Sequence, residues 1–223
     1  MKAMILAAGR GERLRPLTDT LPKPLIEVRG ETLIERHLRR LQAAGFAEVV
    51  VNVAWLAEQI KTRLGDGSRY QLRLHYSEEP AGALETGGGI LKALPLLGPG
   101  PFLVVNADIY TEFPFAGFQP ALVENDLAHL IMVPNPPAHT CGDFMLDGNG
   151  RLHAEGGPRL TYAGIGLHRP EFFEGCTAGR FAMLPLWQRA MRAGRVTGER
   201  YDGAWYDLGT PASLRVLTQL STG

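Results

Sequence analysis

The sequence predicts an α/β fold: a Rossmann-like mixed, mostly parallel sheet flanked by helices, with a small β-rich insertion. Strand-like and helix-like runs alternate through the first half, which is typical of right-handed βαβ units. A loop rich in glycine and arginine follows the first strand-like run directly. The second half contains short strand-like runs around the hairpin signal Asp147-Gly148-Asn149-Gly150. In such a fold, binding residues collect at the carboxyl ends of the parallel strands.

The first half supplies the alternating elements. Strand-like runs cover residues 2–7, 48–53, 71–76 and 102–106, and helix-like runs cover residues 32–44, 55–64 and 85–97. The run 32–44 places Leu33, Ile34, Leu38 and Leu41 on one face. Gly45 suits a cap at its carboxyl end. The run 85–97 is a weaker helix prediction, because three glycines lie in its first turn.

The second half mixes both periods. Strands are expected at residues 127–133, 143–146, 152–154 and 160–167, and helices at residues 182–193 and 211–220. Leu186 and Trp187, within the first of these helices, are interpreted as packing residues. We find no internal repeat, low-complexity tract or linker, so we expect a single domain over residues 1–223.

The composition is that of an ordinary globular protein. The chain has 223 residues and a mass of 24.3 kDa, with 45% hydrophobic residues, which is too apolar for a disordered chain. Twenty-three basic and 23 acidic residues balance, so neither nucleic acid nor an anionic membrane is an expected partner. No apolar run approaches the roughly 18 residues of a membrane span. Cys141 and Cys176 fit no zinc spacing, and we expect free thiols in a cytoplasmic protein.

The loop at residues 6–18 is the segment richest in chemistry. Gly9 and Gly11 let the backbone approach an anion, and successive N–H groups can cradle phosphate oxygens. The pattern reads G-x-G-x-R-L, so Leu14 stands where a dinucleotide-binding loop needs a third glycine, and Arg13 comes just before it. No acidic residue ends the second strand, where Asn52 and Val53 stand, so an oxidoreductase binding NAD or FAD is disfavoured. Arg13 instead offers a forked cation to a phosphate.

Lys23 lies between two prolines, which would hold it in an extended loop and aim it at a phosphate. The whole stretch from residue 6 to residue 25, LAAGRGERLRPLTDTLPKPL, resembles the sugar-1-phosphate nucleotidyltransferases. The segments VVNAD at 104–108 and WYDLGTP at 205–211 resemble two further segments of that family. The resemblance covers essentially the whole chain, and it implies the Rossmann-like fold already expected.

The resemblance implies a metal-dependent transfer. In the family, an aspartate of each of the last two segments binds Mg²⁺, which places Asp108 and Asp207 as the metal ligands; carboxylates are hard ligands suited to this ion. The sugar 1-phosphate would attack the α-phosphorus of the nucleotide and release pyrophosphate, so catalysis would consist of positioning and charge stabilisation. Arg13 is expected on the β- and γ-phosphates and Lys23 on the α-phosphate. The expected catalytic residues are Arg13, Lys23 and Asp108.

Within the family, residues 76–90, YSEEPAGALETGGGI, most resemble the N-acetylmuramic acid α-1-phosphate uridylyltransferases, short bacterial enzymes of peptidoglycan recycling. This implies UTP and N-acetylmuramic acid 1-phosphate as substrates, with UDP-N-acetylmuramic acid as product. Mannose-1-phosphate guanylyltransferases are similar at the same positions, so another sugar or base stays open. A non-catalytic nucleotide-sugar sensor is disfavoured, because both aspartates, Arg13 and Lys23 are kept.

Residues 1–110 are expected to form the nucleotide-binding half. The expected nucleotide-binding residues are Ala8, Gly9, Gly11, Glu12, Arg13, Lys23, Glu79, Gly82 and Ala83. Glu79 can accept a hydrogen bond from uracil N3–H, which cytosine lacks, and Glu78 is an equally placed alternative. The backbone at Gly82 or Ala83 can donate to uracil O4.

Residues 111–223 are expected to form the sugar-binding half. The resemblance carries over Asn106, Gly142, Glu155 and Gly164 as sugar-binding residues. Asn106 stands where many relatives have glycine, and its amide can contact the sugar or its N-acetyl group. Glu155 is followed by Gly156 where many relatives have lysine, so the metal, Lys23 or an arginine such as Arg159 must neutralise the sugar phosphate. The sequence names neither the oligomeric state nor a donor for the lactyl carboxylate.

Overall fold

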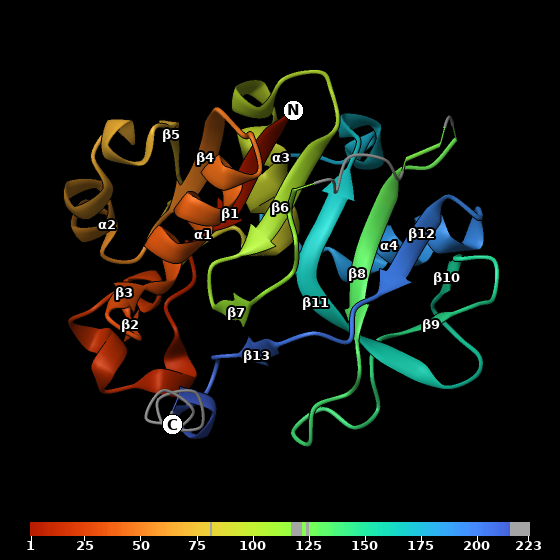
Figure 1. Cartoon of the computed structure of the whole chain (residues 1–223). Helices are drawn as coiled ribbons and strands as arrows, with labels where there is room; N and C mark the ends of the chain where they lie inside the picture. The colour runs from red at the N-terminus through yellow and green to blue at the C-terminus, as the bar shows by residue number, and fades with distance from the viewer. Residues whose placement is uncertain (81, 117–121, 124, 215–223) are drawn as a thin grey trace.

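Four parallel strands form the centre of the sheet, in the order β5-β4-β1-β6. The computed structural model describes residues 1–80, 82–116, 122–123 and 125–214. The strands are β1 (Lys2–Leu6), β4 (Glu48–Val53), β5 (Arg73–Glu78) and β6 (Phe102–Asn106). β1 pairs in parallel with β4 on one side and with β6 on the other, so the strand order reverses beside β1 (Figure 1). In open α/β sheets, ligands bind at such a switch point.

Antiparallel strands continue the sheet beyond β6. β11 (Arg159–His168) runs antiparallel to β6 and to β8 (Ala128–Val133), and β12 (Val196–Arg200) runs parallel to β8. The predicted hairpin is β9 (Phe144–Leu146) with β10 (Leu152–His153), and it joins the sheet through β11. Among the described residues, nine strands belong to this sheet. The predicted fold class, a mixed sheet flanked by helices with a β-rich second half, is confirmed.

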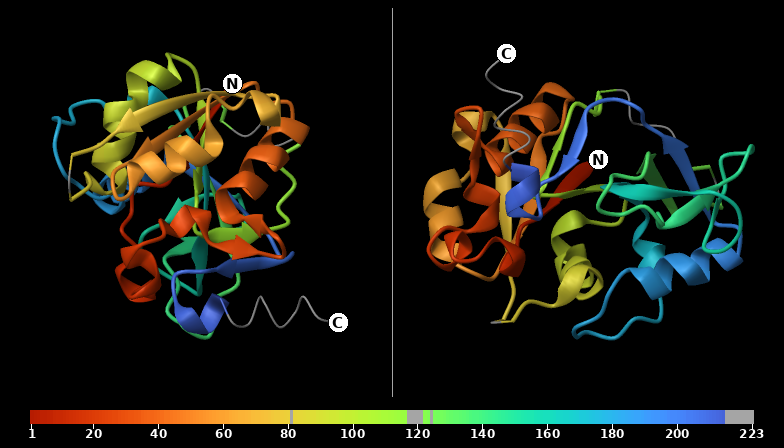
Figure 2. Two further views of the ribbon diagram at one scale, coloured as in Figure 1. Left: turned by 90° about the vertical axis from the view of Figure 1, so that its left-hand side faces the viewer. Right: turned by 90° about the horizontal axis from the view of Figure 1, so that it is seen from below.

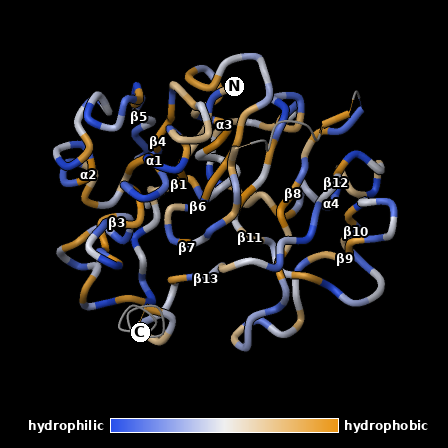
Figure 3. The backbone as a smooth tube through the Cα atoms, in the orientation of Figure 1, coloured by the Kyte–Doolittle hydropathy of each residue, from blue (hydrophilic) through white to orange (hydrophobic). Residues whose placement is uncertain are grey.

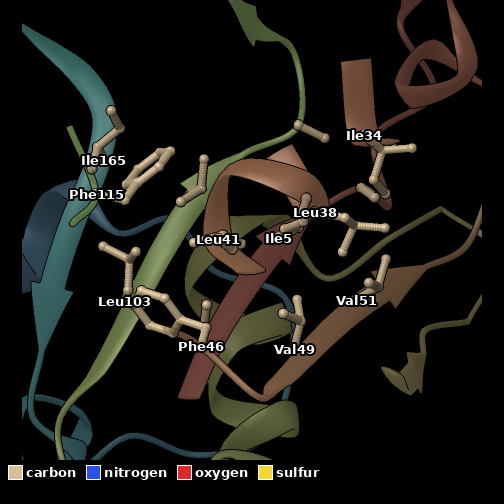
Figure 4. Close-up of a cluster of buried hydrophobic side chains, with 14 of the residues drawn as sticks. Ile5, Ile34, Leu38, Leu41, Phe46, Val49, Val51, Leu103, Phe115 and Ile165 are labelled. Atoms are coloured by element: carbon tan, nitrogen blue, oxygen red, sulfur yellow. The ribbon is translucent and has the colours of Figure 1, made fainter. Parts of the chain in front are cut away.

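Helices cover both faces of the sheet. Side chains alternate along β1, so Ala3 and Ile5 pack with α1 (Leu33–Ala43) and α2 (Ala57–Leu64). Met4 points to the other face and packs with α3 (Glu85–Leu97) and α4 (Leu184–Arg192). Figure 2 shows α3 and α4 on the same side of the sheet, and Figure 4 shows the core beneath α1. Apolar residues dominate the central strands, whereas α2 carries more polar ones (Figure 3).

The helix α1 shows how a local pattern fixes an element. Thr32 caps it, because its hydroxyl accepts from the Glu35 N–H at 3.3 Å and donates to the Glu35 carboxylate at 2.7 Å. The four apolar residues predicted on one face are all buried. Gly45 follows the helix with φ of 86°, as expected of a residue just past a helix end.

Several short elements were not predicted. β7 (Ile109–Thr111) pairs antiparallel with β13 (Trp205–Asp207), and β2 (Glu27–Val28) pairs with β3 (Glu31–Thr32). β12 was also missed, and β5 begins two residues later than expected. Such short strands carry too few residues for a period to be read. Residues 211–214 are helical, and the rest of the helix expected at 211–220 lies outside the described residues. Leu186 and Trp187 are buried in α4, as predicted.

Candidate active site

Two hollows meet at the carboxyl ends of β1 and β6. The first, called here the strand-end hollow, measures about 210 Å³ and opens over the switch point of the sheet. Its lining comprises Leu6, Ala7, Ala8, Gly9, Lys23, Pro24, Asn52, Glu79, Ala83, Glu85, Thr86, Asn106, Ala107 and Asp108. The second, called here the bulge hollow, measures about 280 Å³ and lies beside an irregularity in β11. Asn106 and Asp108 line both hollows, so they stand at the boundary between the two.

The glycine loop enters the strand-end hollow through Ala8 and Gly9. Added side-chain volume at Gly9 would meet nothing within 4 Å, so the backbone there is open to a ligand. Gly11 has φ of 72°, and a Cβ on it would lie 2.9 Å from Thr18 Cγ2. The glycine at 11 therefore lets the loop fold on itself. Neither Gly11 nor Glu12 lines either hollow, and Glu12 is exposed and pairs with Arg10 at 3.1 Å.

Lys23 and Asp108 form an ion pair in the floor of the strand-end hollow. Lys23 opens a short 3-10 turn, Lys23–Leu25, instead of lying in the extended loop that we expected. This turn buries the lysine side chain, of which 9% is exposed, so its cation is held in place toward the strand ends. A buried cation beside a carboxylate is positioned for a phosphate that reaches the same point.

The backbone after Asp108 is fixed from behind by His37 on α1. His37 Nε2 lies 3.0 Å from the Ile109 carbonyl oxygen. Burial lowers the pKa of His37 to about 4, so the imidazole is neutral at pH 7 and its Nε2–H donates to the carbonyl. This hydrogen bond from His37 holds the backbone next to Asp108 in place.

Asp207 reaches Asp108 through the β7–β13 pair. Asp207 opposes Ile109 in the register, and the Leu208 N–H donates to the Asp108 carbonyl at 2.9 Å. Both aspartates line the bulge hollow together with Arg13. A Cβ on Gly209 would lie 2.4 Å from the Arg13 guanidinium and 2.9 Å from Asp207 Oδ1. Glycine at 209 therefore lets Arg13 lie beside Asp207.

The donor set of these two aspartates fits a hard divalent cation. One oxygen of Asp108 is paired with Lys23 and one oxygen of Asp207 accepts from the Gly209 N–H at 2.7 Å, and each carboxylate keeps a second oxygen. Within the described residues, no group of three potential metal-ligating side chains occurs. A cation here would take two protein carboxylates, with substrate oxygens and water as its other ligands.

Glu79, the predicted base-recognising residue, lines the strand-end hollow and is buried. Its two oxygens accept from Asn52 Nδ2 at 2.6 Å and from the Leu84 N–H at 2.7 Å. A carboxylate has about four lone-pair positions, so it can still accept from a ligand. Glu78 points away and pairs with Lys61 on α2 at 2.9 Å.

The turn that follows Glu79 modifies one expectation. The Ala83 N–H donates to the Pro80 carbonyl at 3.1 Å and is not available for uracil O4. Ala83 still lines the strand-end hollow. Gly82 has φ of 101° and open space around its α-carbon but lines neither hollow, so its N–H stays a predicted donor.

Three of the four predicted sugar-binding residues lie at or beside the bulge hollow. Gly164 has φ of 74° in the irregular part of β11, and a Cβ on it would lie 2.8 Å from Asn106 Nδ2. Gly142 is packed against Asn135 and Arg159 next to this hollow, although it does not line it. Glu155, the fourth, lies in a separate depression with Met191 and Arg192 and lines neither hollow, so its contact with the sugar stays a prediction.

Comparison with known proteins gives the family. A model of the family described as "Nucleotidyl transferase" matches residues 2–154. The chain belongs to this nucleotidyltransferase family. Over 221 residues it is 55% identical to an N-acetylmuramate alpha-1-phosphate uridylyltransferase of Neisseria meningitidis serogroup B, covering 96% of each chain. A protein of the same name from Caulobacter vibrioides is 37% identical, over 94% of this chain and 92% of its own. The predicted class of enzyme, a sugar-1-phosphate nucleotidyltransferase, is confirmed.

Solved structures confirm the fold of the transferase. A protein described as a glucose-1-phosphate thymidylyltransferase from Bacillus anthracis superimposes with a TM-score of 0.86 at 19% identity, covering 99% of this chain and 95% of its own. HddC from Yersinia pseudotuberculosis, complexed with GMP-PN, gives 0.82 at 19% identity and 98% coverage of both chains. Among the described residues, no helix is long and apolar enough to cross a membrane.

Sequence reasoning missed several residues of the transferase site. Asn52 was noted only because it is not acidic, yet it lines the strand-end hollow beside Glu79. His139 and Asp143 line the bulge hollow and hydrogen bond to each other at 3.0 Å. Trp205 lines it too and donates to the Ala163 carbonyl at 2.8 Å. The polar residues between Pro136 and Asp143 were the available signal for the bulge hollow.

Proposed function

We propose that this transferase joins UTP and N-acetylmuramic acid 1-phosphate to give UDP-N-acetylmuramic acid and pyrophosphate. The observation that carries the proposal is the position of Asp108, at the boundary of two hollows and in contact with Lys23. The nearly full-length similarity to two N-acetylmuramate alpha-1-phosphate uridylyltransferases supports the choice of base and sugar. Residues 1–110 bind the nucleotide in this proposal, and residues 111–223 bind the sugar.

The strand-end hollow receives UTP. The open backbone at Ala8 and Gly9 lies along the triphosphate, and Glu79 accepts the uracil N3–H while Gly82 donates to O4. Lys23 stabilises charge on the α-phosphate as the P–O bond to pyrophosphate breaks. Arg13, which the structure holds beside Asp207, reaches the leaving group from the bulge-hollow side.

The bulge hollow receives the sugar 1-phosphate. Asn106, over Gly164, faces both substrates, and its amide can donate to or accept from the sugar. A phosphate monoester is already a nucleophile at pH 7, so no protein base is needed and the site's task is to align the attack.

Asp108 and Asp207 would hold Mg²⁺, which supplies Lewis-acid charge between the two phosphates when bound. Enzymes of this family generally use a divalent metal ion. Asp108 lines both hollows and Asp207 lines the bulge hollow, near the boundary where the phosphates of both substrates would meet.

The test is pyrophosphate release with Mg²⁺ over a grid of four nucleoside triphosphates and four sugar 1-phosphates: N-acetylmuramic acid, N-acetylglucosamine, glucose and mannose. Maximal release with UTP and N-acetylmuramic acid 1-phosphate is expected. The variant Asp108→Asn defines the background. A maximum at GTP with mannose 1-phosphate would replace this proposal with the guanylyltransferase alternative, and release in no combination would favour a nucleotide-sugar sensor.

A further inference from the structure

One buried amide connects the two walls of the strand-end hollow. Asn52 is the last residue but one of β4, and its register partners are Leu6 on β1 and Ser77 on β5. Its side chain is buried, with 3% of the residue exposed. Because β4 lies between β1 and β5, a side chain at its carboxyl end can reach the loops that follow both neighbours.

The contacts of Asn52 run in both directions. Its Oδ1 accepts from the Ala7 N–H at 2.7 Å, where β1 passes into the glycine loop. Its Nδ2 donates to Glu79 Oε1 at 2.6 Å. Glu79 Oε2 in turn accepts from the Leu84 N–H at 2.7 Å, which holds the far end of the 80–84 turn. Four groups are thus joined in one chain of hydrogen bonds.

The helix α3 packs against the hydrogen bond between Asn52 and Glu79. A Cβ on Gly89 would lie 2.5 Å from Glu79 Oε1 and 3.0 Å from Asn52 Nδ2. The glycine run in α3, which weakened the helix prediction, therefore provides the space in which the amide and the carboxylate meet. Their bond is enclosed and cannot be replaced easily by water.

We propose that Asn52 is a positioning residue for nucleotide recognition, which fixes Glu79 and the entry to the glycine loop relative to each other. The site needs an acceptor on one side and a donor on the other, and the carboxamide provides both in fixed directions. Asn52 itself does not touch the base in this arrangement; it orients the carboxylate that does. The inference rests on the proposed function for the role of Glu79 in accepting uracil N3–H.

The experiment exchanges the donor and the acceptor. In Asn52→Asp, Ala7 keeps its acceptor, but a carboxylate faces Glu79 and the donor is lost. In the double variant Asn52→Asp, Glu79→Gln, the new Gln amide can donate to the new Asp and still accept from the Leu84 N–H. We expect Asn52→Asp to raise KM and Kd for UTP about tenfold or more, with KM for the sugar 1-phosphate unchanged. We expect the double variant to recover most of that loss.

The control is Ser77→Ala, one strand away in the same register row and equally buried, which should leave both constants unchanged. Asn52→Leu gives a second, uncharged variant, expected to weaken UTP binding without rescue by Glu79→Gln. Unchanged UTP binding in both Asn52 variants would overturn the inference. So would a double variant whose loss of UTP affinity equals the sum of the losses in Asn52→Asp and Glu79→Gln. Equilibrium binding of UTP tests the role of Asn52 separately from the choice of sugar. If the wild-type protein turns over another sugar, only the proposed function is contradicted.

Discussion

The two hollows that meet at Asp108 are built in different ways. The strand-end hollow rests on the ends of parallel strands, and its polar groups bond to one another through Asn52 and Glu79. The bulge hollow rests on an irregular antiparallel strand and on pieces from four other parts of the chain. In the proposed function, a nucleotide base is read by Glu79, and a frame of fixed hydrogen bonds holds that carboxylate in one direction. A sugar site must differ between members, and loops and bulges are where such differences are tolerated.

The largest effect is expected at the boundary of the two hollows. Asp108→Asn removes a carboxylate that lines both and contacts Lys23, so turnover should fall about a hundredfold or more. Steady-state pyrophosphate release at saturating Mg²⁺ measures it. The matched control is Asp202→Asn, an exposed aspartate paired with Arg200. A rate near that of wild type would contradict the role of Asp108 in both sites.

The next effect tests whether the segment around Gly209 positions Arg13 of the glycine loop. Gly209→Ala places a methyl group 2.4 Å from the Arg13 guanidinium, which must move. Turnover should fall about tenfold, and to a similar extent as in Arg13→Ala. Gly148→Ala, with nothing within 4 Å of the new Cβ, serves as control. If Gly209→Ala kept wild-type kcat while Arg13→Ala did not, the contact would have no part in positioning Arg13.

A smaller effect is expected on recognition of the lactyl group of N-acetylmuramic acid 1-phosphate. His139 lines the bulge hollow, and its Nε2 donates to Asp143 Oδ1 at 3.0 Å, so its ring borders the space proposed for the sugar. His139→Gln keeps a donor to Asp143 but removes the ring. We expect KM for N-acetylmuramic acid 1-phosphate to rise about three- to tenfold, with little change for N-acetylglucosamine 1-phosphate. Equal changes for both sugars would assign His139 to loop structure alone.

Acid should destabilise both halves together. Burial lowers the pKa of His37 in the first half and of His168 in the second to about 4. Both take up protons on unfolding between about pH 6.5 and pH 4, so the free energy of unfolding falls as the pH falls through that window. Calorimetry at pH 7 and pH 5 should show one transition with a lower Tm at pH 5. Two separate transitions would mean that the halves fold independently despite the shared sheet.

A second loss of stability belongs to the first half and begins at lower pH. Burial opposes ionisation of Glu35, but hydrogen bonds from Arg63, Thr32 and Tyr70 outweigh it and lower its pKa to about 2. The stabilisation is complete above pH 4.5 and is lost as the pH falls toward 2. Glu35→Gln should remove the part of the acid sensitivity below pH 4.5 in the same calorimetric series, and wild-type acid sensitivity in that variant would contradict it.

The smallest effect is expected at Glu155. The structure places it in a depression with Met191 and Arg192, away from both hollows. Glu155→Gln should therefore leave kcat and KM within about twofold of wild type. A large rise in KM for the sugar 1-phosphate would restore the role that the sequence pattern gave it.

Sequence predicted the strand-end side of the molecule better than the bulge side, for physical reasons. Strand β4 and helix α1 follow simple periods, and Lys23 and Asp108 stand in segments with a recognisable pattern. Glu155 lies outside both hollows, because the course of the chain after the β9–β10 hairpin is not recorded in any period of the sequence. Asn52 was missed because its value depends on two partners, Ala7 and Glu79, that come together only when three strands align.

The short pairing of β7 with β13 has a consequence during synthesis of the protein. On a ribosome, Asp207 is made about a hundred residues after Asp108, which takes about 5 to 20 seconds at common rates of synthesis. A nascent chain that has emerged only through β7 already carries the glycine loop, Lys23 and Asp108, but not Asp207. In the proposed function we therefore expect no pyrophosphate release from a partly made chain, because the second proposed metal ligand arrives only when β13 pairs with β7.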